Sequence, residues 1–209
     1  MPTPVSQLEI INLALGHLKQ RKIASMDEVS VQASEANRCY ETARRDTLRG
    51  HDWGFATNVK PLALNSSYAI SDTGVYAGKW LFAYAYPSNV VAIWHVYNEA
   101  TPDKDNGELF RVVYDDVNNQ KVILTDCDEA LGECTFDLED TTLFDANFVT
   151  AFAFRLAASM ASNLTGDDSI ADAMLKAFNV YISEAERVSS YEERDNSGKG
   201  TTSPYEETR

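Results

Sequence analysis

Residues 1–50 carry apolar positions at the spacing of α-helices. Ser6 and Glu9 match a capping box, in which the serine hydroxyl and the glutamate carboxylate each accept a hydrogen bond from a backbone N–H at a helix start. The apolar positions of this first helix are Leu8, Ile11, Leu15 and Leu18. A second helix is predicted from the face formed by Val29, Ala33, Ala36, Tyr40, Ala43 and Thr47. We therefore expect a pair of helices, and the small alanines permit another helix to approach closely.

The middle of the chain, residues 51–141, changes to short strand patterns. Aromatic and β-branched residues alternate there with turn residues such as asparagine, aspartate, glycine and proline. The predicted strands are Val59–Leu64, Trp80–Tyr86, Val90–Tyr97, Glu108–Tyr114, Lys121–Thr125 and Glu133–Leu138. The connections are too short for the crossover helices of a parallel sheet, so we expect antiparallel pairing.

Helical periodicity returns near Thr142. A third helix is predicted from the apolar face of Phe144, Phe148, Ala151, Phe152, Leu156, Ser159 and Met160. Gly166 is expected to end it, and Ser169 with Asp172 has the spacing of a second capping box. The fourth helix carries Ile170, Met174, Ala177, Tyr181 and Val188 along one side.

These patterns predict an α+β fold. Residues 1–50 and 142–191 form an antiparallel bundle of about four helices, and residues 51–141 form an inserted antiparallel β-rich region. Residues 192–209 have almost no apolar side chains to bury, so we expect an extended, flexible C-terminal arm. The expected core anchors, where the bundle meets the sheet, are Trp53, Phe55, Phe148 and Phe152.

The net charge of −14 is unevenly distributed. Between Glu99 and Asp145 there are 14 acidic and 3 basic residues. A protein that binds nucleic acid without sequence preference needs clustered lysine and arginine, which is the opposite of this segment. The simplest interpretation is a solvated acidic surface that maintains solubility.

The chain carries no recognisable reactive motif, so we expect neither an enzyme nor a cofactor. Gly74–Lys79 is shorter than a phosphate-binding loop and is followed by Trp80 instead of serine or threonine. Asp103–Gly107 begins like a calcium loop, but Glu108 holds the position that needs glycine. The three cysteines have no framework spacing, and neither a signal peptide nor a membrane span is recognisable, so we expect a cytoplasmic protein with reduced thiols and no membrane partner.

The order of several segments resembles a known family. These segments are Ile10–Gly16, Ile23–Met26, the helix through Ala33, Ala36 and Tyr40, Arg44–Arg45, Trp53–Ala56, Tyr84–Pro87, Leu124–Asp126 and the helix with Phe148 and Phe152. Their succession is similar to the tail tubular protein A family, the head-to-tail adaptor (connector) proteins of tailed bacteriophages. The likeness spans nearly the whole chain and is strongest from Ile10 to Ala56, whereas the β-rich region varies within the family.

The resemblance implies a structural virion protein at the head–tail junction, assembled in the host cytoplasm. Its implied partners are sister copies in a ring, commonly of twelve subunits, the portal protein and the tail nozzle protein. Double-stranded DNA is implied to pass through the ring without specific binding. The C-terminal arm is implied to embrace the portal, with Tyr191, Arg194, Tyr205 and Arg209 as candidate contacts.

Two further groups of charged residues are candidates within such a ring. Part of the acidic segment either faces the channel or lies on the outer surface, with Asp103, Asp105, Asp115 and Asp116 as the candidates. The arginines of the second helix either pair with acidic groups of a neighbouring subunit or form an ordinary solvated face, and they are Arg38, Arg44, Arg45 and Arg49. The alternative functions are another tail joining or terminator component, or a small soluble binding module.

Overall fold

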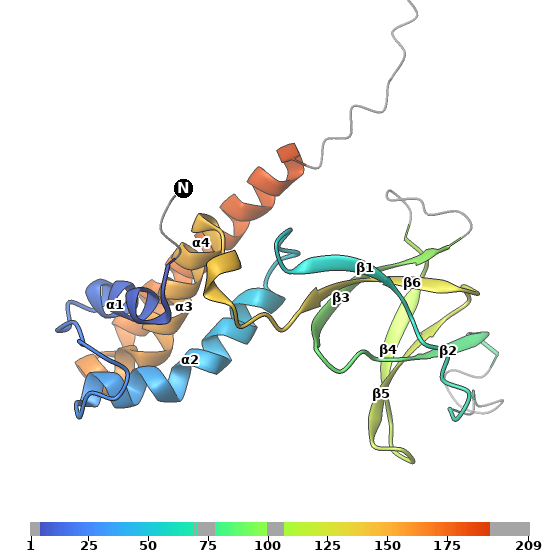
Figure 1. Cartoon of the computed structure of the whole chain (residues 1–209), viewed down its shortest axis with the longest axis horizontal. Coiled ribbons are helices and arrows are strands. Elements are labelled where there is room, and N and C mark those ends of the chain that lie inside the picture. Colours follow the sequence, from blue (N-terminus) through green and yellow to red (C-terminus); the bar gives the residue numbers. More distant parts are fainter. Residues whose placement is uncertain (1–4, 69, 71–77, 100–106, 193–209) are drawn as a thin grey trace, which may run out of the picture.

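Figure 1 shows the computed structural model of the chain, which describes residues 5–68, 70, 78–99 and 107–192. The fold is mixed α+β, as the sequence predicts: the described residues form four α-helices and two small antiparallel sheets. The helices gather in one half, called here the helical lobe, and the strands in the other, called the β lobe (Figure 1). The chain enters the β lobe after the second helix and returns before the third, so the β lobe is an insertion within the bundle.

The helical lobe is organised around its third helix. The helices are α1 (Gln7–His17), α2 (Val31–Arg49), α3 (Ala146–Thr165) and α4 (Asp168–Glu192), with a short 3-10 turn at Thr141–Leu143. α3 packs against the other three helices, and alanines on the facing surfaces, Ala33, Ala36, Ala43, Ala151 and Ala157, are almost completely buried. Small side chains at these contacts let the helix axes approach closely.

Local capping signals set most helix ends. The predicted capping box is confirmed, because Glu9 N–H donates to Ser6 Oγ at 3.2 Å and Ser6 N–H donates to Glu9 Oε2 at 2.7 Å. Gly166 ends α3 with φ of 68°, a left-handed conformation that costs glycine little, as predicted. The second predicted capping box is wrong: α4 begins at Asp168, and Asp167 Oδ1 accepts from Ser169 N–H at 2.9 Å.

Two apolar positions lie elsewhere than the helical spacing predicted. α2 begins at Val31 with Ser30 as its N-cap, so Val29 precedes the helix and is fully exposed instead of buried. On α4, Tyr181 is 39% exposed, whereas its neighbour Ile182 is buried in the helical core. Val29 fails because the helix starts two residues later than its position requires, and on α4 the buried side includes Ile182 in place of Tyr181.

The β lobe consists of two three-stranded sheets. Its strands are β1 (Thr57–Pro61), β2 (Phe82–Ala85), β3 (Val90–Asn98), β4 (Phe110–Asp115), β5 (Gln120–Thr125) and β6 (Ala130–Phe136). Their orders are β1-β6-β3 and β2-β5-β4, and every neighbouring pair is antiparallel, which confirms the predicted pairing. The register of β3 against β6 shifts between Val90 and Ala92 and again between Ile93 and His95.

The β lobe has apolar clusters of its own. One cluster joins residues of both sheets and comprises Leu62, Tyr84, Val96, Ile123, Cys127 and Ala130. Gly132 lies against it, where a Cβ atom would be 2.8 Å from Leu62 Cδ2, so any larger residue here would force this leucine side chain to shift. A smaller cluster of Ala83, Val122 and Leu124 is covered by Tyr68, Ile70 and Trp80. The buried residues of these two clusters all come from outside the helices.

Aromatic side chains fix the end of α2 to α3. Trp53 is buried and donates from Nε1 to the carbonyl of Thr47 at 2.9 Å, and its ring meets Phe148 edge-on at 5.1 Å between centroids. Phe152 is fully buried beside Phe148, whereas Phe55 is half-buried and contacts the Phe148 ring at 5.1 Å. The four expected core anchors thus lie in or against the helical core.

Candidate interaction surfaces

Arg44 is a buried structural residue, which corrects its assignment as a candidate contact with a neighbouring subunit. Its side chain is 1% exposed, and Nη1 donates to the carbonyl of Leu138 at 2.5 Å. The same nitrogen lies 2.8 Å from Asp137 Oδ1, and Nη2 lies 2.6 Å from Glu41 Oε2. Arg44 therefore fastens the segment that leaves β6 to the helical lobe and is not available to another copy.

The other candidate arginines are exposed but also have partners within the chain. Arg38 pairs with Glu35 one turn earlier, at 2.6 Å. Arg45 pairs with Asp137 at 2.8 Å, the carboxylate that also faces Arg44. Arg49 Nη1 donates to the carbonyl of Val91 on β3 at 3.2 Å, which ties the end of α2 to the β lobe. Of the four, Arg49 lies next to a hollow of the surface.

The acidic candidates divide into three cases. Asp115 is 3% exposed and holds its own turn together, because its carboxylate accepts from Asn118 Nδ2 at 2.8 Å and from Gln120 Nε2 at 3.1 Å. The hydrogen bond from the Asn118 side chain is the main reason that the pKa of Asp115 lies below its ordinary value. Asp115 therefore cannot line a channel, and this prediction is wrong. Asp116 is exposed beside it, and Asp103 and Asp105 lie outside the described residues.

The candidate arm contacts fall mostly beyond the described part of the chain. Arg194, Tyr205 and Arg209 lie outside the described residues. α4 continues to Glu192, one residue beyond the predicted boundary at residue 191. Tyr191 therefore belongs to this helix and not to an extended arm. Figure 1 shows the last turns of α4 projecting beyond the other helices.

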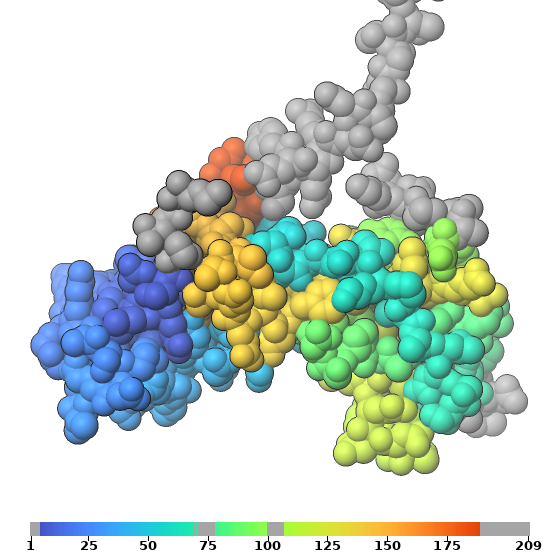
Figure 2. Space-filling model, viewed as in Figure 1, coloured from blue at the N-terminus to red at the C-terminus, as the bar shows by residue number. Residues whose placement is uncertain are grey.

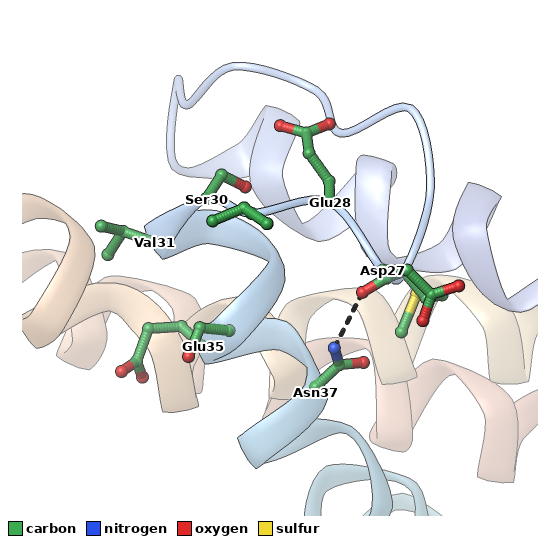
Figure 3. Close-up of a pocket in the computed structure, with 9 residues that line it drawn as sticks. Asp27, Glu28, Ser30, Val31, Glu35 and Asn37 are labelled. Atoms are coloured by element: carbon green, nitrogen blue, oxygen red, sulfur yellow. Dashed lines mark hydrogen bonds between the residues drawn. The ribbon is translucent and has the colours of Figure 1, made fainter.

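The loop before α2, taken together with the first residue of that helix and called here the loop Met26–Val31, presents a second kind of surface. Figure 3 shows it around an open hollow of about 660 Å³, where Asn37 Nδ2 holds the loop by donating to the Met26 carbonyl at 3.0 Å. Val29 is fully exposed and Val31 is 65% exposed, and Asp27 is exposed in the same loop. Glu28 accepts from Ala24 N–H and pairs with Arg21, so its charge is already compensated. The loop therefore combines two uncovered valines with the Asp27 carboxylate, for which the described residues provide no ion-pair partner.

A notch lies at the other end of α2. Its volume is about 220 Å³, and it is lined by Arg49 of α2, Tyr86, Ala92, Ile93 and Trp94 of the β3 side, and Val112 and Lys121 of the β4–β5 hairpin. The tip of that hairpin, yellow-green in Figure 2, projects from the body of the β lobe. Lys121 Nζ lies 5.0 Å from the centre of the Tyr86 ring, a cation–π distance. The notch is therefore aromatic and apolar with two cationic side chains.

Sequence reasoning missed one aromatic surface because its members come from three helices. His17 of α1 stacks on Phe154 of α3 at 4.0 Å between centroids, and Phe154 stacks on Tyr181 of α4 at 5.1 Å. Partial burial in this stack lowers the pKa of His17. Leu13, one turn before His17, is 48% exposed. Helical spacing within one segment cannot reveal a row that crosses three helices.

The described residues contain no group of three or more histidine, cysteine, aspartate or glutamate side chains placed to hold a metal ion. Cys39, Cys127 and Cys134 are free and buried, and burial raises the pKa of each thiol, that of Cys134 to about 11. Among these same residues, no helix has the length and apolar character needed to cross a bilayer.

Comparison with known proteins adds no family assignment: no protein-family model matches the chain, and no curated protein matches it significantly. Its surfaces are therefore interpreted from their own contacts, burial and charge.

Proposed function

We propose that this chain is a structural subunit of the head-to-tail junction of a tailed bacteriophage, an adaptor that forms a ring with its own copies beneath the portal. DNA passes through this ring, and the nozzle of the tail binds its far side. The proposal starts from the resemblance of the sequence to the head-to-tail adaptor family. The segment that carries most of this resemblance, Ile10–Ala56, folds as α1, a loop, α2 and the aromatic anchor at Trp53, all within one core.

The observation that carries the proposal is the shape of α4. Ile182 and Ala185 are buried in the helical core, but the helix continues to Glu192 beyond them. Figure 1 shows these last turns projecting past the rest of the bundle. The chain then continues into residues 193–209, which carry few apolar side chains. A projecting helix that leads into a polar segment is suited to contacts outside its own subunit, and repeating one weak contact around a ring gives strong avidity.

Uncovered apolar side chains support assembly with sister copies. Val180 on α4 is 66% exposed, and Leu13 on α1 is 48% exposed. Single exposed apolar residues are common on any surface, but contiguous ones mark contact sites. Together with Tyr181 and the exposed loop valines, they provide several faces that a ring would cover.

The test is copurification with the portal protein of the same genome. The two proteins are co-expressed, the portal carries the affinity tag, and the eluate is imaged by electron microscopy. We expect the chain to elute with the portal and to form an added ring on its tail-side face. Elution of the portal alone, with the chain remaining a monomer at micromolar concentration, would overturn the proposal. Copurification with a tail tube protein in place of the portal would identify a different joining component.

A further inference from the structure

Two surfaces of the chain are complementary and lie at opposite ends of one helix. The loop Met26–Val31 lies at the start of α2, and the notch begins at Arg49, the last residue of α2. A helix of 19 residues spans ~28 Å at 1.5 Å per residue. The loop and the notch are therefore separate surfaces, and the loop of one copy can meet the notch of another.

The loop and the notch match in apolar character. Val29 and Val31 expose β-branched side chains at the loop tip, where no described residue covers Val29. The notch offers the rings of Tyr86 and Trp94 and the 41% exposed side chain of Val112. The position of Trp94 is set by the second register shift of β3 and by a hydrogen bond of 2.7 Å from its Nε1 to Thr135 Oγ1. A fixed aromatic floor provides a preformed site for a small apolar side chain.

Their charges are also complementary. Lys121 is one of only three basic residues between Glu99 and Asp145, so a cation in this acidic segment is unusual. It shares the notch with Arg49. On the loop, Asp27 is exposed two residues before Val29, whereas Glu28 is already paired with Arg21. Opposite charges on the two surfaces favour a single orientation of docking and disfavour contact of either surface with itself.

We propose that the loop Met26–Val31 of one copy docks into the notch of the next copy, with Val29 on the aromatic floor and Asp27 near Lys121 and Arg49. This inference rests on the proposed assembly into a ring and names the surfaces that join its subunits. A contact between two different surfaces is heterologous, and repetition of a heterologous contact closes into a ring when the rotation between copies permits it.

Covalent trapping tests this contact even if free subunits associate only weakly. Protein carrying Val29→Cys is mixed with an equal amount of protein carrying Val112→Cys, and a short bis-maleimide is added at neutral pH. We expect a covalent dimer of the two variants in at least about tenfold excess over the dimers that either variant forms alone. The three native cysteines are buried with raised thiol pKa values, so the unmodified chain serves as the reaction blank.

Leu143→Cys provides the matched control, because Leu143 is 52% exposed but lies outside both surfaces. Equal yields for Val29→Cys with Val112→Cys and for Val29→Cys with Leu143→Cys would overturn the inference. Predominant linkage of Val29→Cys to itself would also overturn it, because it would indicate a symmetric contact through the loop.

A charge exchange gives an independent test. Asp27→Lys and Lys121→Glu are each expected to lower the yield of trapped dimer about tenfold, and combining one variant of each in the mixture should restore it. Circular dichroism checks that these exposed substitutions leave the fold intact. If trapping fails while the chain still forms rings on the portal, the inference falls and the proposed function stands. If trapping succeeds and the portal is not bound, the contact stands and the adaptor function falls.

Discussion

Replacing Arg44 by methionine gives the sharpest test of how the two lobes are joined. Methionine can replace the apolar stem of the arginine side chain, but it has no charge and no hydrogen-bond donors. The Arg44 side chain is 1% exposed, and it donates to the Leu138 carbonyl and faces the Asp137 and Glu41 carboxylates. The substitution removes these partners at once, at the place where the segment after β6 meets α2.

The expected loss of stability depends on the polar groups that stay buried after the arginine is removed. A buried carbonyl that loses its donor costs about 1–3 kcal/mol. Asp137 keeps 20% of its side chain exposed and still pairs with Arg45, so water and Arg45 recover part of its loss. Glu41 is 56% exposed and adds little. We therefore expect Arg44→Met to lower the free energy of unfolding by about 2–4 kcal/mol.

Arg45→Met is the matched control, because Arg45 pairs with the same Asp137 carboxylate but is 56% exposed. Exposed ion pairs contribute about 0–1 kcal/mol, so this variant should remain close to the natural chain. Urea unfolding followed by circular dichroism and tryptophan fluorescence measures both. A difference of less than about 0.5 kcal/mol between the two variants would refute the conclusion that burial makes Arg44 a structural residue.

Three further outcomes are expected. Asp115→Asn removes a carboxylate whose pKa is lowered in the folded state, mainly by the hydrogen bond from the Asn118 side chain. The ionised carboxylate stabilises the fold at neutral pH, and this stabilisation is lost as pH falls through the lowered pKa. The stability gap to the natural chain in urea titrations should therefore shrink below about pH 4, and a gap that widens in acid would contradict this. Phe148→Ala should cost about 3–5 kcal/mol in the same titration, because Phe148 is fully buried between aromatic rings, and a cost below about 1.5 kcal/mol would contradict its place as an anchor. Deleting Ser197–Arg209 should leave the thermal midpoint unchanged but abolish copurification with the portal, whereas undiminished copurification would exclude the tail from portal binding.

Local signals in the sequence predicted local structure well. The capping box of Ser6 with Glu9 and the helix end at Gly166 depend on neighbouring residues only, and both are confirmed. The order of helices and strands was also predictable, because helical and strand periodicities differ along the chain. The second capping box failed because α4 begins before Ser169, and the Asp167 carboxylate accepts the hydrogen bond from the Ser169 N–H.

Features that depend on distant residues were not predictable in this way. The burial of Arg44 requires the segment Asp137–Glu139, which lies more than ninety residues away in the chain, so helical spacing alone suggested a solvated side chain. The division into two sheets follows from the pairing of β1 with β6. The paired residues Thr57 and Thr135 are also far apart in the sequence, so no local pattern marks their contact. The notch likewise combines Arg49, Tyr86 and Lys121 from three separate elements.

Native mass spectrometry of the chain purified with its portal tests the central claim most directly, because it counts the copies of the chain bound to each portal ring. Assembly as an adaptor predicts one dominant complex, in which each portal assembly binds the same number of chains. That number is commonly twelve in the family that the sequence resembles. A spectrum that contains the portal assembly and the single chain as separate species, at concentrations where both are folded, would contradict it.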